Sequence, residues 1–147
     1  MVKTIVIGCD HGGVELKNEL IKRLTAEGYD ILNAGVDTTD PVDYPDVAVK
    51  AARMVTAGAA DCGILICGTG IGIGIAANKV RGIRAALCSD CFSARMSREH
   101  NNANIITLGA RTIGVELAWE IAKAYLGAEF LGGKHAVRVN KIDSITE

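Results

Sequence analysis

The feature that most constrains the fold is a series of short apolar runs separated by longer amphipathic segments. Val and Ile predominate in these runs, and adjacent positions are both apolar, which is typical of strands buried on both faces. Such strands alternate with helices in βαβ units, whose parallel sheet is covered by helices on both sides. The predicted strands are residues 5–7, 31–32, 63–66, 83–87 and 105–108.

The intervening segments have helical periodicity. Leu16, Leu20 and Leu24 fall on one face of the first predicted helix, and we expect its charged residues on the opposite face. Gly28 is expected to end this helix, and the run Asp-Tyr-Pro at 43–45 to begin the next one. The charged residues assigned to the outer face are Lys17, Glu19, Lys22, Arg23 and Glu27.

Length and composition favour one globular α/β domain over residues 1–147. A chain of 147 residues with 49% hydrophobic residues and only 2 Pro is long and apolar enough to bury one core. The prediction is a three-layer fold with a five-stranded parallel sheet flanked by helices, followed by a C-terminal helix within 134–147. No strand follows that helix, so we expect it to pack on a neighbouring chain.

Charge and cysteine content narrow the function further. The formal net charge of −1 gives no overall attraction to nucleic acid or to an anionic membrane, and no apolar run approaches the roughly 18 residues of a membrane span. Because the N-terminus has the pattern of a strand and the 5 Cys are odd in number, we expect a cytoplasmic protein with reduced thiols. Cys88 and Cys91 have the C-x-x-C spacing of redox and zinc sites. A structural zinc site needs a second such pair and the sequence has none, so ordinary packing is favoured.

Ligands of open parallel sheets bind beyond the carboxyl ends of the strands, so chemistry is expected just after residues 7, 66, 87 and 108. The first of these ends carries Asp10 and His11 between glycines. Asp10 is either a helix cap or, with His11, a ligand contact on a backbone that approaches the ligand closely.

The third predicted strand leads into Cys67-Gly-Thr-Gly-Ile-Gly-Ile-Gly74. Glycine at every second position leaves backbone N–H groups accessible at the start of a helix, which favours anion binding over a simple turn. Cys67 heads this loop, where amides would stabilise a thiolate that moves a proton or attacks an electrophile, and Thr69 is within reach of the same ligand. A partial dinucleotide fingerprint at Gly72 keeps a nucleotide-binding module as the alternative, with Asp90 as its only acidic candidate.

The remaining candidates follow later in the chain. His100 is either a partner for a helix-end carbonyl or an acid–base residue, and Asn101 follows it. Lys134 and Arg138 lie four residues apart, on one face of a predicted helix. They form either a solvated basic face or, together with Arg111, a phosphate site.

The ordered set of these motifs resembles the type B ribose-5-phosphate isomerases, within the wider group that includes the galactose-6-phosphate isomerase subunits. The resemblance rests on six segments that span nearly the whole chain. They are Gly-Cys-Asp-His-Gly-Gly at 8–13, Asp-Tyr-Pro at 43–45, the glycine segment at 64–79, Glu-His-Asn-Asn-Ala-Asn at 99–104, Gly-Ala-Arg at 109–111 and Gly-Gly-Lys-His-Ala-Val-Arg at 132–138.

The resemblance implies a Rossmann-like fold and the interconversion of D-ribose 5-phosphate and D-ribulose 5-phosphate, in the pentose phosphate pathway, without metal or organic cofactor. It implies a homodimer, possibly paired into a tetramer, with active sites at the interface. Cys67 matches the base that carries the proton between C2 and C1, and His100 the acid that opens the sugar ring. The implied substrate contacts are Asp10, His11, Gly68, Thr69, Gly70, Ile71, Gly72, Asn101, Arg111, Lys134 and Arg138, with Asp10 and Thr69 also placed among the catalytic residues.

Two departures from the family pattern bear on these expectations. Lys134 stands where the family often has Arg, which removes two-pronged phosphate binding at that position. Where some members carry a Glu base, this chain has Ile75, so Cys67 is its candidate base. A six-carbon substrate such as allose or galactose 6-phosphate remains the alternative, because sequence does not show the depth of a pocket.

Overall fold

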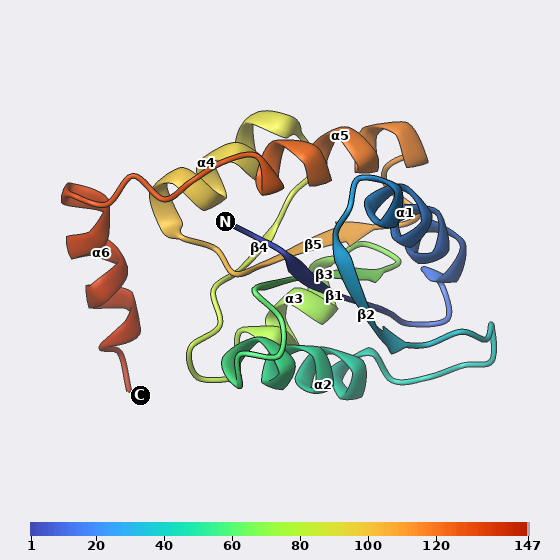
Figure 1. The fold of residues 1–147 in the computed structure, drawn as a ribbon. Coiled ribbons are helices and arrows are strands. Elements are labelled where there is room, and N and C mark those ends of the chain that lie inside the picture. The colour runs from blue at the N-terminus through green and yellow to red at the C-terminus, as the bar shows by residue number, and fades with distance from the viewer. Residues whose placement is uncertain (147) are drawn as a thin grey trace.

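The computed structural model describes residues 1–146 and contains a five-stranded parallel sheet between two layers of helices (Figure 1). The strand order is β2-β1-β3-β5-β4, and every neighbouring pair is parallel. The predicted fold class is therefore confirmed. The strands are β1 (Thr4–Cys9), β2 (Asp30–Gly35), β3 (Cys62–Cys67), β4 (Ala85–Leu87) and β5 (Ile105–Gly109).

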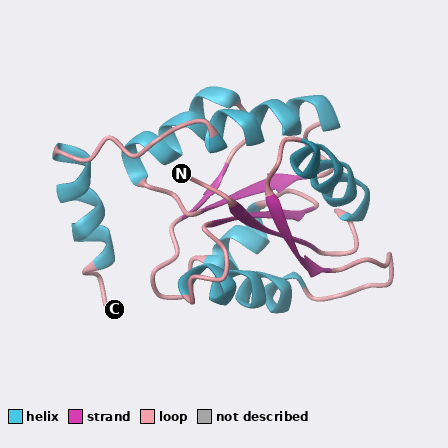
Figure 2. Cartoon of the chain, in the orientation of Figure 1, coloured by secondary structure: helices cyan, strands magenta, loops and turns pink. Residues whose placement is uncertain are grey.

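Helices cover both faces of the sheet, as Figure 2 shows. One layer consists of α1 (Val14–Ala26), α4 (Cys91–Asn101) and α5 (Val115–Leu126), and the other of α2 (Tyr44–Thr56) and α3 (Ile71–Ala77). The last helix, α6 (Lys134–Asp143), stands away from both layers and contacts α4. Within residues 1–146, every helix is too short or too polar to traverse a lipid bilayer.

The three central strands, β1, β3 and β5, are buried on both faces because alternate residues enter two separate cores. In β3, Ile64 and Ile66 join the core beneath α1, α4 and α5, whereas Leu65 and Cys67 join the core beneath α2 and α3. All four side chains are at most 5% exposed. The apolar character at every position of the predicted strand is thus explained by a helix layer on each side.

Helix boundaries agree with the local signals in the sequence. Gly28 has φ +95° just past the end of α1, and its N–H donates to the Thr25 carbonyl while that of Tyr29 donates to Leu24. This pair of bonds is the Schellman arrangement, which places a glycine in the left-handed region after a helix. Pro45 lies in the first turn of α2, as predicted.

Two expectations require correction. Lys17 was expected on the solvated face of α1, but its side chain is fully buried, because its ammonium group reaches Asn33 on the edge strand β2 and Asp37 just after that strand. The fourth strand is shorter than predicted and begins at Ala85. Its predicted first residues belong to a turn in which the Arg84 N–H donates to the Asn104 side chain instead of to a neighbouring strand.

The strand order reverses between β1 and β3. The chain passes from β1 to β2 on one side of β1 and then crosses to β3 on its other side. Loops that leave two such neighbouring strands diverge to opposite faces and open a crevice at the carboxyl ends. The segments that follow the first and third predicted strands, residues 8–13 and 67–74, therefore adjoin the same crevice.

Candidate active site

The loop after β3 encloses the Cys67 sulfur. Cys67 is 5% exposed, and its Sγ accepts a hydrogen bond from the Gly70 N–H at 3.1 Å. Thr69 is exposed, and its Oγ1 accepts the Ile71 N–H at 3.2 Å, which fixes the start of α3. An N–H aimed at the sulfur stabilises a thiolate more than a neutral thiol, because the hydrogen bond is then charge-assisted.

The same loop is held against β5. The buried Thr107 hydroxyl donates to the Gly70 carbonyl at 2.7 Å, and the Arg111 N–H donates to the Gly68 carbonyl at 2.9 Å. Gly70 has φ +78°, and a Cβ there would lie 2.7 Å from Leu87 Cδ1 and 2.8 Å from the carbonyl carbon of Leu108. Only glycine fits this position without strain.

Several amides of the loop remain available to a ligand. Within residues 1–146, the N–H groups of Gly68, Thr69 and Gly72 find no protein acceptor. Three free donors on neighbouring residues suit an oxygen that carries negative charge. Tyr44 covers one end of this group, because a Cβ on Gly72 would lie 2.5 Å from its Cζ.

Asp10 and His11 follow β1 at the same edge. The Asp10 carboxylate is 9% exposed and accepts the Gly12 N–H at 2.9 Å, while the N-cap of α1 is Gly13. Asp10 therefore shapes the loop and does not cap the helix. The His11 Nδ1 accepts the Val42 N–H at 3.2 Å, so this nitrogen carries no proton and the neutral ring bears its proton on Nε2.

Arg111 completes this group of residues. It is exposed at the end of β5, and its side chain lies over Gly68, where a Cβ would be 3.5 Å from the Arg111 Cδ. A guanidinium above a row of free amides adds positive potential to the same small surface. We call Asp10, His11, Cys67, Gly68, Thr69, Gly70, Gly72 and Arg111 the loop cluster.

The four other cysteines lie in different surroundings. Burial raises the pKa of Cys9 to about 11, that of Cys62 to about 12 and that of Cys88 to about 11. Cys91 is partly exposed, and all five cysteines are free thiols. Within residues 1–146, no three His, Cys, Asp or Glu side chains come together in a metal-binding geometry.

A second group of predicted residues lies around the N-terminus of α6. The rings of His100 and His135 stack with centroids 4.2 Å apart and planes 7° apart. Lost hydration lowers the pKa of His135, and His100, Lys134 and Arg138 lower it further. The cationic Lys134 and Arg138 and the N-terminus of α6 favour an anion. We call His100, Asn101, Lys134, His135 and Arg138 the helix cluster.

The two clusters lie at opposite ends of the strands, the loop cluster at their carboxyl ends and the helix cluster at their amino ends. The helix α4 begins just after β4, at the carboxyl edge, and ends just before β5, at the amino edge, and its 11 residues span about 16 Å. His100 and Asn101 occupy its last turn, and α6 stands beyond that end in Figure 1. The predicted phosphate site of Arg111, Lys134 and Arg138 is therefore divided within one chain.

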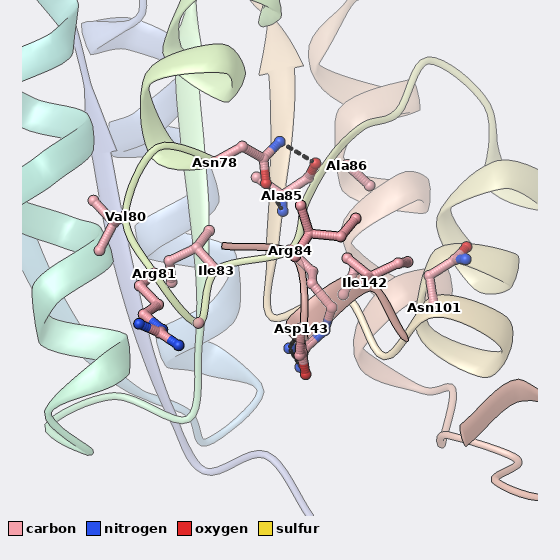
Figure 3. A pocket seen from close by; sticks show the side chains of 13 residues that line it. Asn78, Val80, Arg81, Ile83, Arg84, Ala85, Ala86, Asn101, Ile142 and Asp143 are labelled. Atoms are coloured by element: carbon pink, nitrogen blue, oxygen red, sulfur yellow. Dashed lines mark hydrogen bonds and ion pairs between the residues drawn. The ribbon is translucent and has the colours of Figure 1, made fainter. Parts of the chain in front are cut away.

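A pocket of about 530 Å³ lies near the helix cluster but holds little of the predicted chemistry (Figure 3). Of the predicted site residues it includes Asn101 alone. Its Arg84 already donates to the Asp143 carboxylate at 3.0 Å and to the Asn102 carbonyl at 3.1 Å. None of the predicted catalytic residues lines this pocket, whereas three of them, Asp10, Cys67 and Thr69, belong to the loop cluster.

The structure adds three residues that sequence reasoning did not single out for the site. Thr107 holds the Gly70 carbonyl, Tyr44 lies on Gly72, and His135 stacks on His100. Tyr44 and His135 stand inside segments that carried the family resemblance, which was the available signal. Thr107 lies in an apolar strand, and nothing in the sequence distinguishes its hydroxyl from an ordinary strand threonine.

Comparisons with known proteins agree along the full length of the chain. The sequence model of the Ribose/Galactose Isomerase family matches residues 5–142. The chain is 46% identical over 146 residues to ribose-5-phosphate isomerase B of Escherichia coli, covering 99% of this chain and 98% of that protein. It is 49% identical to D-erythrulose-4-phosphate isomerase of Pectobacterium atrosepticum, covering 95% and 92%. Ribose-5-phosphate isomerase B of Clostridium thermocellum has a similar structure, with a TM-score of 0.94 at 54% identity and 95% of both chains covered.

The close contact at Gly70 generates a stability prediction. Gly70→Ala should lower the free energy of unfolding by about 2 kcal/mol or more, because the new Cβ meets Leu87 and the backbone of β5 at a positive φ. Urea denaturation at fixed protein concentration measures the change. Gly114→Ser is the matched control, because Gly114 is an N-cap with open space around it, and a change within about 0.5 kcal/mol is expected there. Equal losses in both variants would contradict the contact.

Proposed function

Because the chain belongs to the Ribose/Galactose Isomerase family and is an isomerase, we propose that it interconverts D-ribose 5-phosphate and D-ribulose 5-phosphate through an enediolate. One observation carries the proposal: a thiol that accepts an N–H lies beside three free amides and a guanidinium. An aldose–ketose isomerisation needs a base for a carbon acid and donors for the oxygen that becomes charged. The loop cluster offers both.

In this proposal the Cys67 thiolate removes the C2 proton of the open-chain aldose and returns it to C1. The electron pair released from the C2–H bond forms the enediolate double bond, and negative charge develops on the sugar oxygens. The free N–H groups of Gly68, Thr69 and Gly72 stabilise that charge, and each donor of this kind is typically worth about 3 kcal/mol in the transition state. Gly70 and Ile71 hold the backbone of the loop in place for these contacts.

The neighbouring side chains bind and orient the sugar. His11, with its proton on Nε2, donates to a substrate oxygen, and the Asp10 carboxylate accepts from a hydroxyl. The Thr69 hydroxyl exchanges a proton with the same oxygens. Arg111 adds a fixed positive charge beside them. These roles are consistent with the place of each residue at the mouth of the crevice between β1 and β3.

Ring opening and phosphate binding require the helix cluster. His100 acts as the acid that opens the ring, Asn101 binds a hydroxyl, and Lys134 and Arg138 bind the phosphate, with Lys134 as a point charge. A pentose phosphate is too short to reach from the loop cluster to the helix cluster of one chain, because the two ends of the strands lie about 16 Å apart. The proposal therefore includes a homodimer in which the helix cluster of one chain faces the loop cluster of the other.

An exposed apolar surface supports such a pairing. Ile75 on α3 is 60% exposed and Phe92 on α4 is 65% exposed, while Ile71 and Leu87, which adjoin Gly70, are about half exposed. A surface of large apolar side chains beside a catalytic loop is typical of a subunit interface. Burying it against a second copy also excludes water from the loop cluster, which strengthens the interactions of its amides.

The proposal includes no metal and no organic cofactor. The charge of the enediolate is met by amides and cations of the protein, so the reaction needs no further Lewis acid. We include a cytoplasmic location and a single domain as well. Five free thiols, four of them buried, suit a reducing compartment.

A six-carbon substrate is not favoured, because the relatives at 46% and 54% identity are ribose-5-phosphate isomerases B. The comparison at 49% identity with a D-erythrulose-4-phosphate isomerase makes a four-carbon sugar phosphate the stronger competitor. All these substrates present the same reacting carbons to Cys67 and differ in the distance from there to the phosphate. Discrimination therefore depends on the spacing between the loop cluster and the helix cluster.

The substrate is tested by measuring kcat/KM for a series of sugar phosphates that differ in length. We expect kcat/KM for ribose 5-phosphate to exceed that for D-erythrulose 4-phosphate and that for allose 6-phosphate by at least about tenfold each. A sugar that is one carbon shorter or longer displaces the phosphate from Lys134 and Arg138 when its reacting carbons lie at Cys67. Each assay is run with and without EDTA. A preference for the four-carbon or six-carbon substrate would overturn the assignment, and loss of activity in EDTA with recovery on adding a divalent ion would overturn the metal-free mechanism.

Cys67 is tested by substitution and by alkylation. Cys67→Ala should lower kcat by about 10² to 10⁴ and leave the fold intact, because a positioned general base is removed from a loop held by other bonds. Iodoacetamide should inactivate the wild type at pH 7.5, and substrate should protect it. Peptide mapping separates Cys67 from Cys91, which is also partly accessible. If Cys67→Ala still exchanges the substrate C2 proton with solvent at the wild-type rate, Cys67 is not the base.

The division of the site between two chains is tested with a mixed dimer. One chain carries Cys67→Ala, the other carries His100→Ala, and two affinity tags isolate the heterodimer. Each homodimer should be impaired, whereas the heterodimer should recover about half of the wild-type activity, because one of its two sites then contains no substitution. An inactive heterodimer would place both residues in a site built from a single chain. A wild type that sediments as an active monomer would do the same.

A further inference from the structure

The buried ammonium group of Lys17 has no part in the mechanism above. Its side chain is 0% exposed, although lysine is among the residues least often buried. Burying an ammonium group is costly unless it is paired and hydrogen-bonded. A residue of this kind in the first turns of α1, close in sequence to Asp10 and His11, therefore needs a specific explanation.

The partners of Lys17 lie where the chain leaves β2. Its Nζ donates to Asn33 Oδ1 at 2.9 Å and to Asp37 Oδ1 at 2.5 Å. Asn33 in turn donates through Nδ2 to the same Asp37 oxygen at 2.9 Å, and its Oδ1 accepts the Gly35 N–H. The three side chains thus form a closed network around the turn that follows β2.

This turn begins the segment 36–43, which leads to the loop cluster. At its first residue, the Val36 N–H donates to the Cys9 carbonyl, directly before Asp10. Near its far end, the Val42 N–H donates to His11 Nδ1, and the segment then enters α2 at Tyr44, which lies on Gly72. Residues 37–41 between these two points are exposed and have no packing of their own to fix them.

We infer that Lys17 is a positioning residue, whose ion pair with Asp37 fixes the segment 36–43 so that the Val42 amide holds His11 with its proton on Nε2. This inference rests on the proposed function, in which that Nε2–H contacts the sugar. The hydrogen bond from Lys17 also lowers the pKa of Asp37, so the Asp37 carboxylate stays ionised at neutral pH. Lys17 itself touches no substrate.

The contacts suggest that Lys17 can be changed without unfolding the protein. Asp37 is 65% exposed, so it remains hydrated when its partner is removed, and no buried carboxylate is left unpaired. Lys17→Met keeps a long apolar stem on the buried face of α1. Asp37→Ala breaks the same ion pair from the solvent side and leaves the Lys17 ammonium group hydrogen-bonded to Asn33 Oδ1. Lys50→Met is the matched control, because Lys50 is exposed, lies near Asp37 and makes the same change of charge.

The first measurement reports the His11 ring directly and does not depend on activity. Nitrogen-15 shifts distinguish the two imidazole tautomers, and the chain contains only 3 His, so the signal lost in His11→Ala assigns the ring. The wild type and Lys50→Met should show His11 with its proton on Nε2. Lys17→Met and Asp37→Ala should show a mixture of tautomers. An unchanged tautomer in both variants overturns the inference, whatever the substrate of the enzyme proves to be.

The second measurement is a double-mutant cycle on ribose 5-phosphate kinetics. Lys17→Met and Asp37→Ala should each lower kcat/KM about tenfold, mainly through KM, as expected for one weakened substrate hydrogen bond. In a His11→Ala background the same substitutions should add less than about twofold, because the residue they position is gone. Additive losses, or an equal loss in Lys50→Met, overturn the inference. A wild type inactive on ribose 5-phosphate would refute the proposed function and leave the tautomer measurement to decide the role of Lys17.

Discussion

The close approach of the Gly70 backbone to the end of β5 is the constraint on which the rest of the site depends. The Thr107 hydroxyl can reach the Gly70 carbonyl only because Gly70 has no side chain and adopts a positive φ. That bond turns the loop so that the Gly70 N–H meets the Cys67 sulfur while the neighbouring amides stay free. A buried hydroxyl on β5 thus fixes both the proposed base and the proposed donors, and neither can move without the other.

Sequence reasoning predicted the layers of this fold well, because strands such as β3 are apolar at every position and the amphipathic segments between them are long. It was wrong at Lys17, where charge was taken as evidence of exposure. The spacing carried the correct information, since Lys17 precedes Leu20 by three residues and Leu24 by seven and therefore shares their face. What the sequence could not show was an ion pair with Asp37, which depends on where β2 ends.

The division of the site also lay beyond the sequence pattern. Arg111, Lys134 and Arg138 were grouped by their shared charge, but they lie on elements that end at opposite edges of the sheet. The parallel direction of the strands causes this outcome, because α4 has to return from the carboxyl end of β4 to the amino end of β5. By contrast, Asp10 and His11 follow β1 and Cys67 ends β3, and these neighbouring strands bring the three residues to adjacent carboxyl ends.

The short strand β4 limits how the molecule can associate. It forms one edge of the sheet with only three residues, too few to template a strand from another chain along its open side. Extension of the sheet into a fibre is thereby disfavoured at this edge, although large apolar side chains lie beside it. In the proposed dimer, recognition between copies on this side would depend on side chains such as Leu87 and Phe92, and not on backbone groups, which every protein shares. Such a contact can diverge between relatives by point substitution, so that two similar enzymes in one cell need not exchange subunits.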